Sequence, residues 1–498
     1  MVDIQNQEEW FELASGRFIA DTEISKKMVT LKRIRPECNQ EDATNFSWDE
    51  SGMAELFNEV YQCDTRYCPE RKSWYTYDGT CWKKDTEGLL VSSKVREFVR
   101  LLCLYGSEIT DEEKRKPFLT WVGKMGDRRF RERLIKDARD NMSINAAAFD
   151  NHPHLINCLN GTYDLDEMVF REHRWDDFLT MQTNFNFTTR DVSEIHFPRW
   201  DKFIDEVTCG DKEKARYLQI ALGYSILGTS KEECMFILHG KTTRNGKSTL
   251  LSAIHHLLGN YAMVSPVSII CKSDRAKNAE AASPTIAALK GKRFVTMAES
   301  NQYGKLDEET IKQLTGGEEI SARNLYESVM TFLPQFTMWL SCNDLPAVQD
   351  KSLFASDRIR VIEFNRHFTA DERDETLKDL FQTQEAMQGI FAWLVAGCFM
   401  YKRFKLKMPE HLQEVVRQYE KDNDIVLQFL EDKCEQDDEA KVKQNDLYGH
   451  FKIWCKGNGY YIMNSKKFAA ALNAHPEWVK ETYMSSGYKC IKGLAMKG

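Results

Sequence analysis

Residues 239–250 have the sequence "HGKTTRNGKSTL", and this stretch decides the fold that the rest of the chain must build. The apolar run "MFIL" precedes it and "LSAIHHLLG" follows it, which predicts a buried strand, a turn, and a helix that Gly246 opens and Gly259 ends. A phosphate-binding loop requires this order, because backbone N–H groups and the helix dipole together create an anion site. Five residues separate Gly240 from Gly246, one more than usual, and the extra residue precedes Gly246, so it can bulge without moving Lys247.

The residue types in this loop predict nucleotide chemistry. Lys247 is expected to reach the β- and γ-phosphates of ATP, and Ser248 to place its hydroxyl on Mg²⁺. The further predicted nucleotide-binding positions are Gly240, Asn245, Gly246 and Thr249. A solvated Gly-Lys-Ser turn is the alternative, and the strand, turn and helix context favours the nucleotide site. The predicted cofactors are therefore ATP and Mg²⁺.

Polar side chains follow two more apolar segments that are expected to be strands. "RFVTMAES" delivers Glu299, a carboxylate that can polarise the attacking water and share in the metal shell. "FTMWLSCND" delivers Asn343, whose amide suits a hydrogen bond to that water or to the γ-phosphate. A surface glutamate and an asparagine that begins a turn are the alternatives. Lys247, Glu299 and Asn343 are thus predicted to be catalytic.

Short apolar strands alternate with helices on both sides of the loop, which predicts an α/β class with a mostly parallel central sheet. Upstream, an aromatic segment predicts a hairpin with a turn at Gly79, and "SSKVREFVRLLCLYGSE" predicts a helix that begins at a serine cap. The predicted domains are an N-terminal α+β domain, a connector with short strands, a helical collar with an ATPase core, and a helical linker with a winged helix, over residues 1–150, 151–198, 199–400 and 401–498.

Bulk composition excludes some classes of protein. With 498 residues, 42% hydrophobic and 29% charged, the chain suits a protein of two to four globular domains. Neither a membrane span nor a secretory leader is expected, and fourteen scattered cysteines suit a reducing cytosol, so a cytoplasmic location is predicted. A net charge of −8 argues against a generally basic surface that coats nucleic acid, but it permits nucleic acid in a narrow channel.

The C-terminal region differs in charge from the rest of the chain. From Lys441 onward, ten lysines against three acids give a net charge of +7. Two predicted helices, the second with Lys466 and Lys467 in its first turn, and a hairpin are typical of a winged helix on DNA. A winged helix that docks protein is the alternative. The acidic run "EDKCEQDDEAK" just before is expected to be a solvated linker.

Five segments in order resemble a superfamily 3 helicase: "GKTTRNGKSTL", "RFVTMAES", "IKQLTGGEEISARNLYES", "FLPQFTMWLSCNDLPAV" and "SDRIRVIEF". More narrowly, they are similar to the primase–helicase family of poxviruses, phages and phage-like mobile elements. The resemblance covers residues 150–400 well and extends more weakly into the flanking regions. The loop is one residue longer than is usual in the family. The sequence also shows no strand with the paired acids of a primase, so the resemblance supports a helicase better than a primase.

The resemblance implies an AAA+-like subunit in a hexameric homo-oligomer that binds ATP between neighbours and moves 3′ to 5′. Arg358 has the family's position for an arginine finger, a cation that the neighbouring subunit supplies to the transition state. Arg360 is the second candidate for this arginine finger, and it is also a predicted nucleotide-binding residue. On the residues alone, either arginine suits an ordinary salt bridge at a strand edge.

The same resemblance implies a hairpin in "EISARNLYESVMTF" that projects into the ring. Arg323 and Tyr326 are its predicted DNA contacts, a cation for phosphate and an aromatic ring for sugar or base. Lys312 is predicted to grip DNA or to sense nucleotide, with a helix-surface lysine as the alternative.

The predicted function is an ATP-dependent replicative DNA helicase of a phage or phage-like element in the bacterial cytoplasm, acting on single-stranded and forked DNA. In a related hypothesis, the basic C-terminal region also recognises double-stranded origin DNA. A separate primase is a further predicted partner. The alternatives are a DNA-binding regulator switched by ATP and a packaging or partition ATPase. The predicted hairpin argues against both alternatives.

Overall fold

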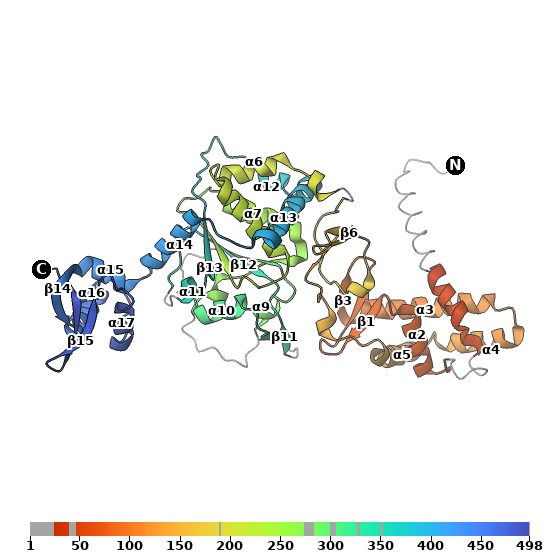
Figure 1. Cartoon of the computed structure of the whole chain (residues 1–498). Helices are drawn as coiled ribbons and strands as arrows, with labels where there is room; N and C mark the ends of the chain where they lie inside the picture. The colour runs from red at the N-terminus through yellow and green to blue at the C-terminus, as the bar shows by residue number, and fades with distance from the viewer. Residues whose placement is uncertain are drawn as a thin grey trace.

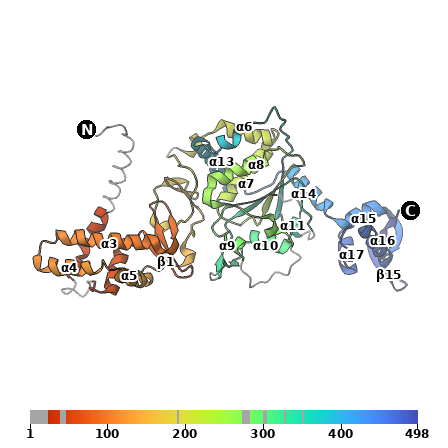
Figure 2. The same ribbon diagram turned by 180° about the vertical axis from the view of Figure 1, so that it is seen from behind.

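The computed structural model describes residues 24–38, 46–188, 191–272, 283–298, 305–325, 329–348 and 352–497. Figure 1 shows three lobes in chain order, of which the middle one is built on a large sheet and the last is joined to it by α14 (Glu410–Asp422). Figure 2 gives the view from behind. The predicted Glu299 and Tyr326 lie outside the described residues. Within these residues, no helix has the length and apolar character that crossing a bilayer demands.

The middle lobe contains a five-stranded sheet in which every neighbouring pair is parallel. In spatial order its strands are β13 (Ile359–Glu363), β7 (Met235–His239), β12 (Thr337–Cys342), β9 (Phe294–Ala298) and β8 (Ala262–Val264). The expected α/β class with a parallel central sheet is confirmed. These strands are almost wholly buried, as both faces of a parallel sheet are when helices cover them.

Alternate residues of β7 enter two separate cores. Phe236 and Leu238 pack into a core with the upper helices of Figure 1, whereas Met235 and Ile237 pack into a core with the lower ones. The upper helices are α6 (Pro198–Val207), α7 (Lys212–Ile226), α8 (Lys247–Leu258), α12 (Leu377–Leu380) and α13 (Gln384–Phe404). The lower elements are α9 (Pro284–Ala287), α10 (Glu308–Thr315), α11 (Ser352–Ala355) and the strand pair β10 (Ile320–Ala322) and β11 (Met330–Phe332).

The N-terminal lobe confirms the aromatic hairpin but corrects the start of the following helix. Its strands are β1 (Thr65–Cys68), β2 (Ser73–Tyr77) and β3 (Trp82–Asp85), and its helices are α2 (Glu50–Tyr61), α3 (Leu89–Glu108), α4 (Glu112–Lys124) and α5 (Arg128–Asn141). The prediction of a serine cap is wrong, because α3 begins at Leu89, ahead of the serines. The Asp85 carboxylate accepts hydrogen bonds from the N–H groups of Leu90 and Val91 at 3.0 and 2.9 Å, and so it supplies the missing partners of the first turn.

A small connector sheet joins the first two lobes. It consists of β4 (Leu155–Cys158), β5 (Gly161–Asp164) and β6 (Val169–Arg171), with the predicted Asn-Gly turn between β4 and β5. The buried Asn157 amide donates to the carbonyls of Thr80 and Met181 at 2.9 and 3.1 Å, and its backbone N–H donates to the Tyr261 hydroxyl at 3.1 Å. One asparagine therefore ties the N-terminal lobe to the middle lobe.

The C-terminal lobe contains α15 (Ile425–Lys433), β14 (Cys434–Lys443), α16 (Gln444–Gly457), α17 (Ser465–Leu472), β15 (Glu481–Ser485) and β16 (Tyr488–Met496). The expected hairpin is β15–β16, and the Asn464 side chain caps α17, the second of the two expected helices. The acidic run expected to be a linker is instead the edge strand β14. Its acidic side chains face solvent while its backbone pairs with β16, and charged side chains on an edge strand prevent pairing with further chains.

Candidate nucleotide site

The glycine-rich loop joins β7 to α8, and two glycines in it have a structural requirement. Gly246 has φ +88°, and a Cβ atom there would lie 2.4 Å from Val207 Cγ1. A Cβ atom on Gly240 would lie 2.4 Å from the Asn245 amide nitrogen. A side chain at either position would therefore displace the loop because of this close approach, and at Gly246 the left-handed backbone also favours glycine. The predicted helix is confirmed, with Gly246 and Gly259 as its flanking residues.

The extra loop residue is accommodated by a bulge that the chain after β13 holds in place. Arg244 has φ +59°, and its carbonyl accepts a hydrogen bond from the Phe368 N–H at 2.9 Å. The His367 ring lies 2.9 Å, measured from Nδ1, from the carbonyl of Thr243. The bulge therefore precedes Gly246, and Lys247 remains the first residue of α8, as the sequence predicts.

Lys247 and Asn343 meet at the carboxyl end of the sheet. The buried Lys247 ammonium donates to the carbonyls of Gly240 and Cys342 at 3.1 and 2.9 Å and to Asn343 Oδ1 at 3.1 Å. The two residues converge because β7 and β12 are adjacent and parallel, so that their carboxyl ends share one edge. The catalytic roles of these residues stay predictions.

His239 and Glu363, which the sequence interpretation missed, lie at the same edge. They are paired across β7 and β13, and His239 Nδ1 lies 4.0 Å from Glu363 Oε1. Burial lowers the pKa of His239, against the opposing effect of the Glu363 charge. An acid near the end of "RIRVIEF" was the available signal, because Glu363 is the last residue of β13 and Asn343 directly follows β12.

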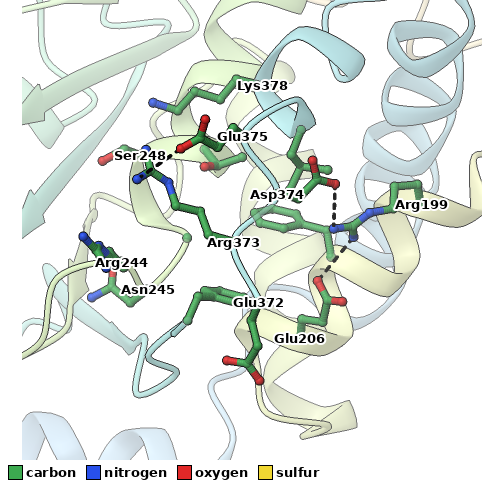
Figure 3. Close-up of a pocket in the computed structure, with 15 residues that line it drawn as sticks. Arg199, Glu206, Arg244, Asn245, Ser248, Glu372, Arg373, Asp374, Glu375 and Lys378 are labelled. Atoms are coloured by element: carbon green, nitrogen blue, oxygen red, sulfur yellow. Dashed lines mark hydrogen bonds and ion pairs between the residues drawn. The ribbon is translucent and has the colours of Figure 1, made fainter. Parts of the chain in front are cut away.

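A cavity of about 360 Å³ opens beside the loop (Figure 3). The loop, the first turn of α8, α6 and the segment from Phe368 to Lys378 line it. The sequence interpretation assigned no role to α6 or to that last segment. Ser248 and Thr249 face this space together with Asn245. A helix N-terminus, a Ser248 hydroxyl and a concave space of this size suit a nucleoside triphosphate with Mg²⁺.

Arg358 and Arg360 lie at the other end of the sheet. Arg358 Nη1 donates to Thr315 Oγ1 at 2.9 Å, and its guanidinium forms an ion pair with the Glu233 carboxylate. Arg358 immediately precedes β13, whose five residues, at roughly 3.3 Å each, separate it from the edge that carries the loop. It therefore does not reach the loop of its own chain.

Arg360 is held more deeply than Arg358. It donates to the Leu406 carbonyl at 2.6 Å and the Tyr217 hydroxyl at 3.5 Å, lies 3.7 Å from Glu232, and its side chain is 11% exposed. These partners all belong to its own chain. The predicted role of Arg360 as a nucleotide ligand stays untested, and its contacts indicate a structural role as well.

The predicted DNA contacts are distributed over two lobes. Lys312 is half-buried on α10, and Arg323 directly follows β10 with its carbonyl accepting from the Ser283 N–H at 2.9 Å. Lys466 and Lys467 are exposed in the first turn of α17. Contact of these side chains with DNA stays a prediction.

Three family profiles match successive parts of the chain. Residues 54–209 match the family described as "D5 N terminal like", and residues 421–489 match "Poxvirus D5 protein-like". Residues 238–358, which include the loop and end at Arg358, match a family of unknown function. The two D5-type matches lie on either side of the five-stranded sheet in the sequence.

Curated relatives come from large DNA viruses. A mimivirus (Acanthamoeba polyphaga mimivirus) protein named "Putative helicase L207/L206" is 25% identical over 442 residues, which are 82% of this chain and 45% of that protein. "Primase D5" of fowlpox virus is 24% identical over 251 residues, 48% of this chain and 30% of that protein. This chain thus spans less than half the length of these relatives.

A solved structure of the NrS-1 C-terminal region covers 90% of this chain and 100% of its own, with 10% identity and a TM-score of 0.49, a similarity too low to support an argument. The similarity of this chain to the viral proteins is therefore taken from the sequence matches alone. The order of the D5-type profiles along the chain and the named viral relatives agree with the motif order around the loop. Residues 54–209 and 421–489 of this chain are thus similar to D5-type proteins, and most of the chain is similar to a putative helicase of a large DNA virus.

Proposed function

We propose that this chain is the motor part of an ATP-dependent replicative DNA helicase. The names of its relatives support a replicative helicase-like role. The observation that carries the proposal is the meeting of Lys247 and Asn343 at one edge of the sheet, next to the cavity, while Arg358 stands at the opposite edge. A subunit built in this way holds a nucleotide at one end and offers a cation at the other.

In the proposed site, Lys247 exchanges its carbonyl partners for phosphate oxygens, and the N-terminus of α8 adds N–H donors. The Ser248 hydroxyl holds Mg²⁺, which with ATP supplies the phosphoryl chemistry. The Asn343 amide, already within hydrogen-bond distance of Lys247, orients the attacking water. Glu299 remains the proposed base for that water.

We further propose that copies of the chain assemble into a ring, hexameric by family resemblance. Head-to-tail assembly brings the Arg358 edge of one copy to the loop edge of the next, where a cation stabilises the charge of the transition state. Nucleotide turnover then moves the β10–β11 hairpin, with Arg323 and the proposed Tyr326, along a DNA strand in 3′ to 5′ direction. Forked and single-stranded DNA are the proposed substrates, and a separate primase is a proposed partner.

The C-terminal lobe is proposed to bind duplex DNA as a winged helix. Its order of helix, strand, two helices and two strands supports this, as does the exposure of Lys466 and Lys467 on the second of the paired helices. Recognition of origin DNA follows from the same proposal. The reported relatives belong to viruses of eukaryotes and do not support a bacterial host, so we propose a role in replicating a large DNA virus or a related element.

The test is strand displacement on a forked duplex with ATP and Mg²⁺, comparing the unaltered chain with Lys247→Ala. Loss of unwinding with retained DNA binding supports a motor. Lys241→Ala, which removes an exposed lysine of the same loop, is the matched control and should unwind normally. DNA binding that depends on ATP, with no unwinding by the unaltered chain, contradicts the proposal and supports the ATP-switched regulator.

A further inference from the structure

The cavity beside the loop is lined by charged side chains of both signs (Figure 3). At the end that holds Ser248, Arg244, Arg373 and Lys378 line the wall together with the N-terminus of α8, and the Glu375 carboxylate lies 3.4 Å from Arg373. At the far end, Arg199 lies between two carboxylates, 3.2 Å from Glu206 and 3.8 Å from Asp374. Basic groups therefore outnumber acidic ones next to the loop, whereas carboxylates outnumber the single arginine at the far end.

The two far carboxylates are held in place by their neighbours. Asp374 Oδ1 accepts from the Thr376 N–H and hydroxyl at 3.1 and 2.7 Å, and these bonds lower the pKa of Asp374. Glu206 is fixed by Arg199 and lies 3.8 Å from Lys202. Each carboxylate can accept about four hydrogen bonds, so both retain capacity for a ligand that donates.

The cavity also has apolar surface. Phe203, Phe368 and Leu377 line it. Phe203 packs within 3.6 Å of the position that a Cβ atom on Gly246 would occupy, so this apolar surface reaches the loop. A ligand that matches these groups has an anionic end, an apolar face and hydroxyl donors. A nucleoside triphosphate has all three, because its base is apolar on its faces and its sugar carries hydroxyls.

We infer that the cavity binds the nucleoside end of the triphosphate, with Glu206 and Asp374 accepting hydrogen bonds from the sugar hydroxyls. This rests on the proposed function, in which the loop binds the phosphates. Glu206 and Asp374 thereby act as specificity-determining residues that select ligands with a hydroxylated sugar. A carboxylate that accepts from a ribose hydroxyl is an established way for proteins to recognise nucleotides.

The experiment measures equilibrium binding of three ligands to the full chain in the presence of Mg²⁺: ATP, 2′,3′-dideoxy-ATP and inorganic tripolyphosphate. We expect ATP to bind about tenfold more tightly than the dideoxy nucleotide, because loss of the hydroxyls leaves charged acceptors without partners. The double variant Glu206→Gln with Asp374→Asn should bind the two nucleotides within about twofold of each other. Asp371→Asn, in the same segment but outside the cavity, is the matched control and should preserve the tenfold preference.

The outcomes separate this inference from the proposed function. Equal binding of ATP and dideoxy-ATP by the unaltered chain overturns the sugar contact while leaving the phosphate site intact, and this comparison needs no variant to fold. Preservation of the preference in the double variant overturns the assignment to Glu206 and Asp374. Failure of the unaltered chain to bind any of the three ligands overturns the proposed function itself.

Discussion

The two ends of the central sheet are built from the same strands but in different ways. At the carboxyl end, Lys247, Asn343 and the loop glycines face one another within a single chain, and their hydrogen bonds are made among themselves. At the amino end, Arg358 has no phosphate loop in reach and pairs instead with Glu233 and Thr315 on the surface of the lower core.

This difference teaches that the proposed phosphate site and the proposed arginine finger lie at ends that one chain cannot bring together. The length of β13 separates the two ends. If both act on one nucleotide, as we propose, a second copy must bring its Arg358 to the loop. The following predictions test whether the two ends act on one nucleotide.

Arg358→Ala should give the largest effect on turnover. We expect ATP hydrolysis to fall on the order of 10³-fold, because the cation that stabilises the transition state is lost. ATP affinity should change little, since Arg358 does not touch the loop of its own chain. The measurements are steady-state phosphate release and ATP binding on the same preparation.

A mixture of Arg358→Ala and Lys247→Ala chains provides the control for action in trans. In a random ring, about one quarter of the sites combine an intact loop with an intact arginine from the neighbour. Recovery of activity toward this fraction supports the shared site. If the mixture is as inactive as each variant alone, the arginine does not act across a subunit boundary.

Lys247→Ala should reduce turnover by about 10²- to 10³-fold, the usual effect of removing one electrostatic contact to a developing charge. Unlike Arg358→Ala, it should also weaken ATP binding, because Lys247 lies in the loop itself. Binding and hydrolysis measured together distinguish the two ends. Unchanged ATP affinity in this variant would contradict the position that we propose for the phosphates.

Arg360→Met tests whether the second arginine belongs to the fold. We expect unfolding to require about 3 kcal/mol less, because Glu232 and the Leu406 carbonyl lose a buried charged partner. Arg358→Ala should cost less, about 1 kcal/mol, because the Glu233 carboxylate that loses its partner is 49% exposed to water. Chemical denaturation of both variants compares them directly, and equal stability would show that Arg360 is not structural.

Lys466→Ala and Lys467→Ala should give the smallest effect. If α17 contacts DNA phosphates, each substitution should reduce the salt dependence of duplex binding by about 0.9 in the slope of log K against log salt. ATP hydrolysis without DNA should be unchanged. Titrations at several salt concentrations measure the slope, and an unaltered slope in both variants favours the protein-docking alternative for this lobe.

Local sequence was sufficient for much of the fold and for the centre of the site. The apolar strand before Gly240, the glycine at the start of α8 and the asparagine after β12 were all predicted, because each depends on neighbours within a few residues. Parallel pairing then required Lys247 and Asn343 to share one edge. The Asn464 cap and the β15–β16 turn followed from equally local signals.

Contacts between distant segments were not predictable in this way. The start of α3 was missed because the Asp85 carboxylate, from the preceding strand, replaces a serine cap. The acidic run at β14 became a strand because β16, far along the chain, supplies its hydrogen-bond partners. Arg199 and Asp374 meet across the cavity although more than a hundred residues separate them, and neither has a distinctive local pattern.

The amino-acid sequence alone determined that this chain has a glycine-rich loop between a buried strand and a helix, and that Asn343 follows a neighbouring strand. Tertiary structure alone decided what surrounds that loop and which partners hold Arg358 and Arg360. The physical reason is range: glycine conformation, capping and apolar periodicity act over a few residues. A cavity lined by charged groups of α6 and of the chain after β13, by contrast, requires the packing of these segments against each other, and no short segment specifies that packing.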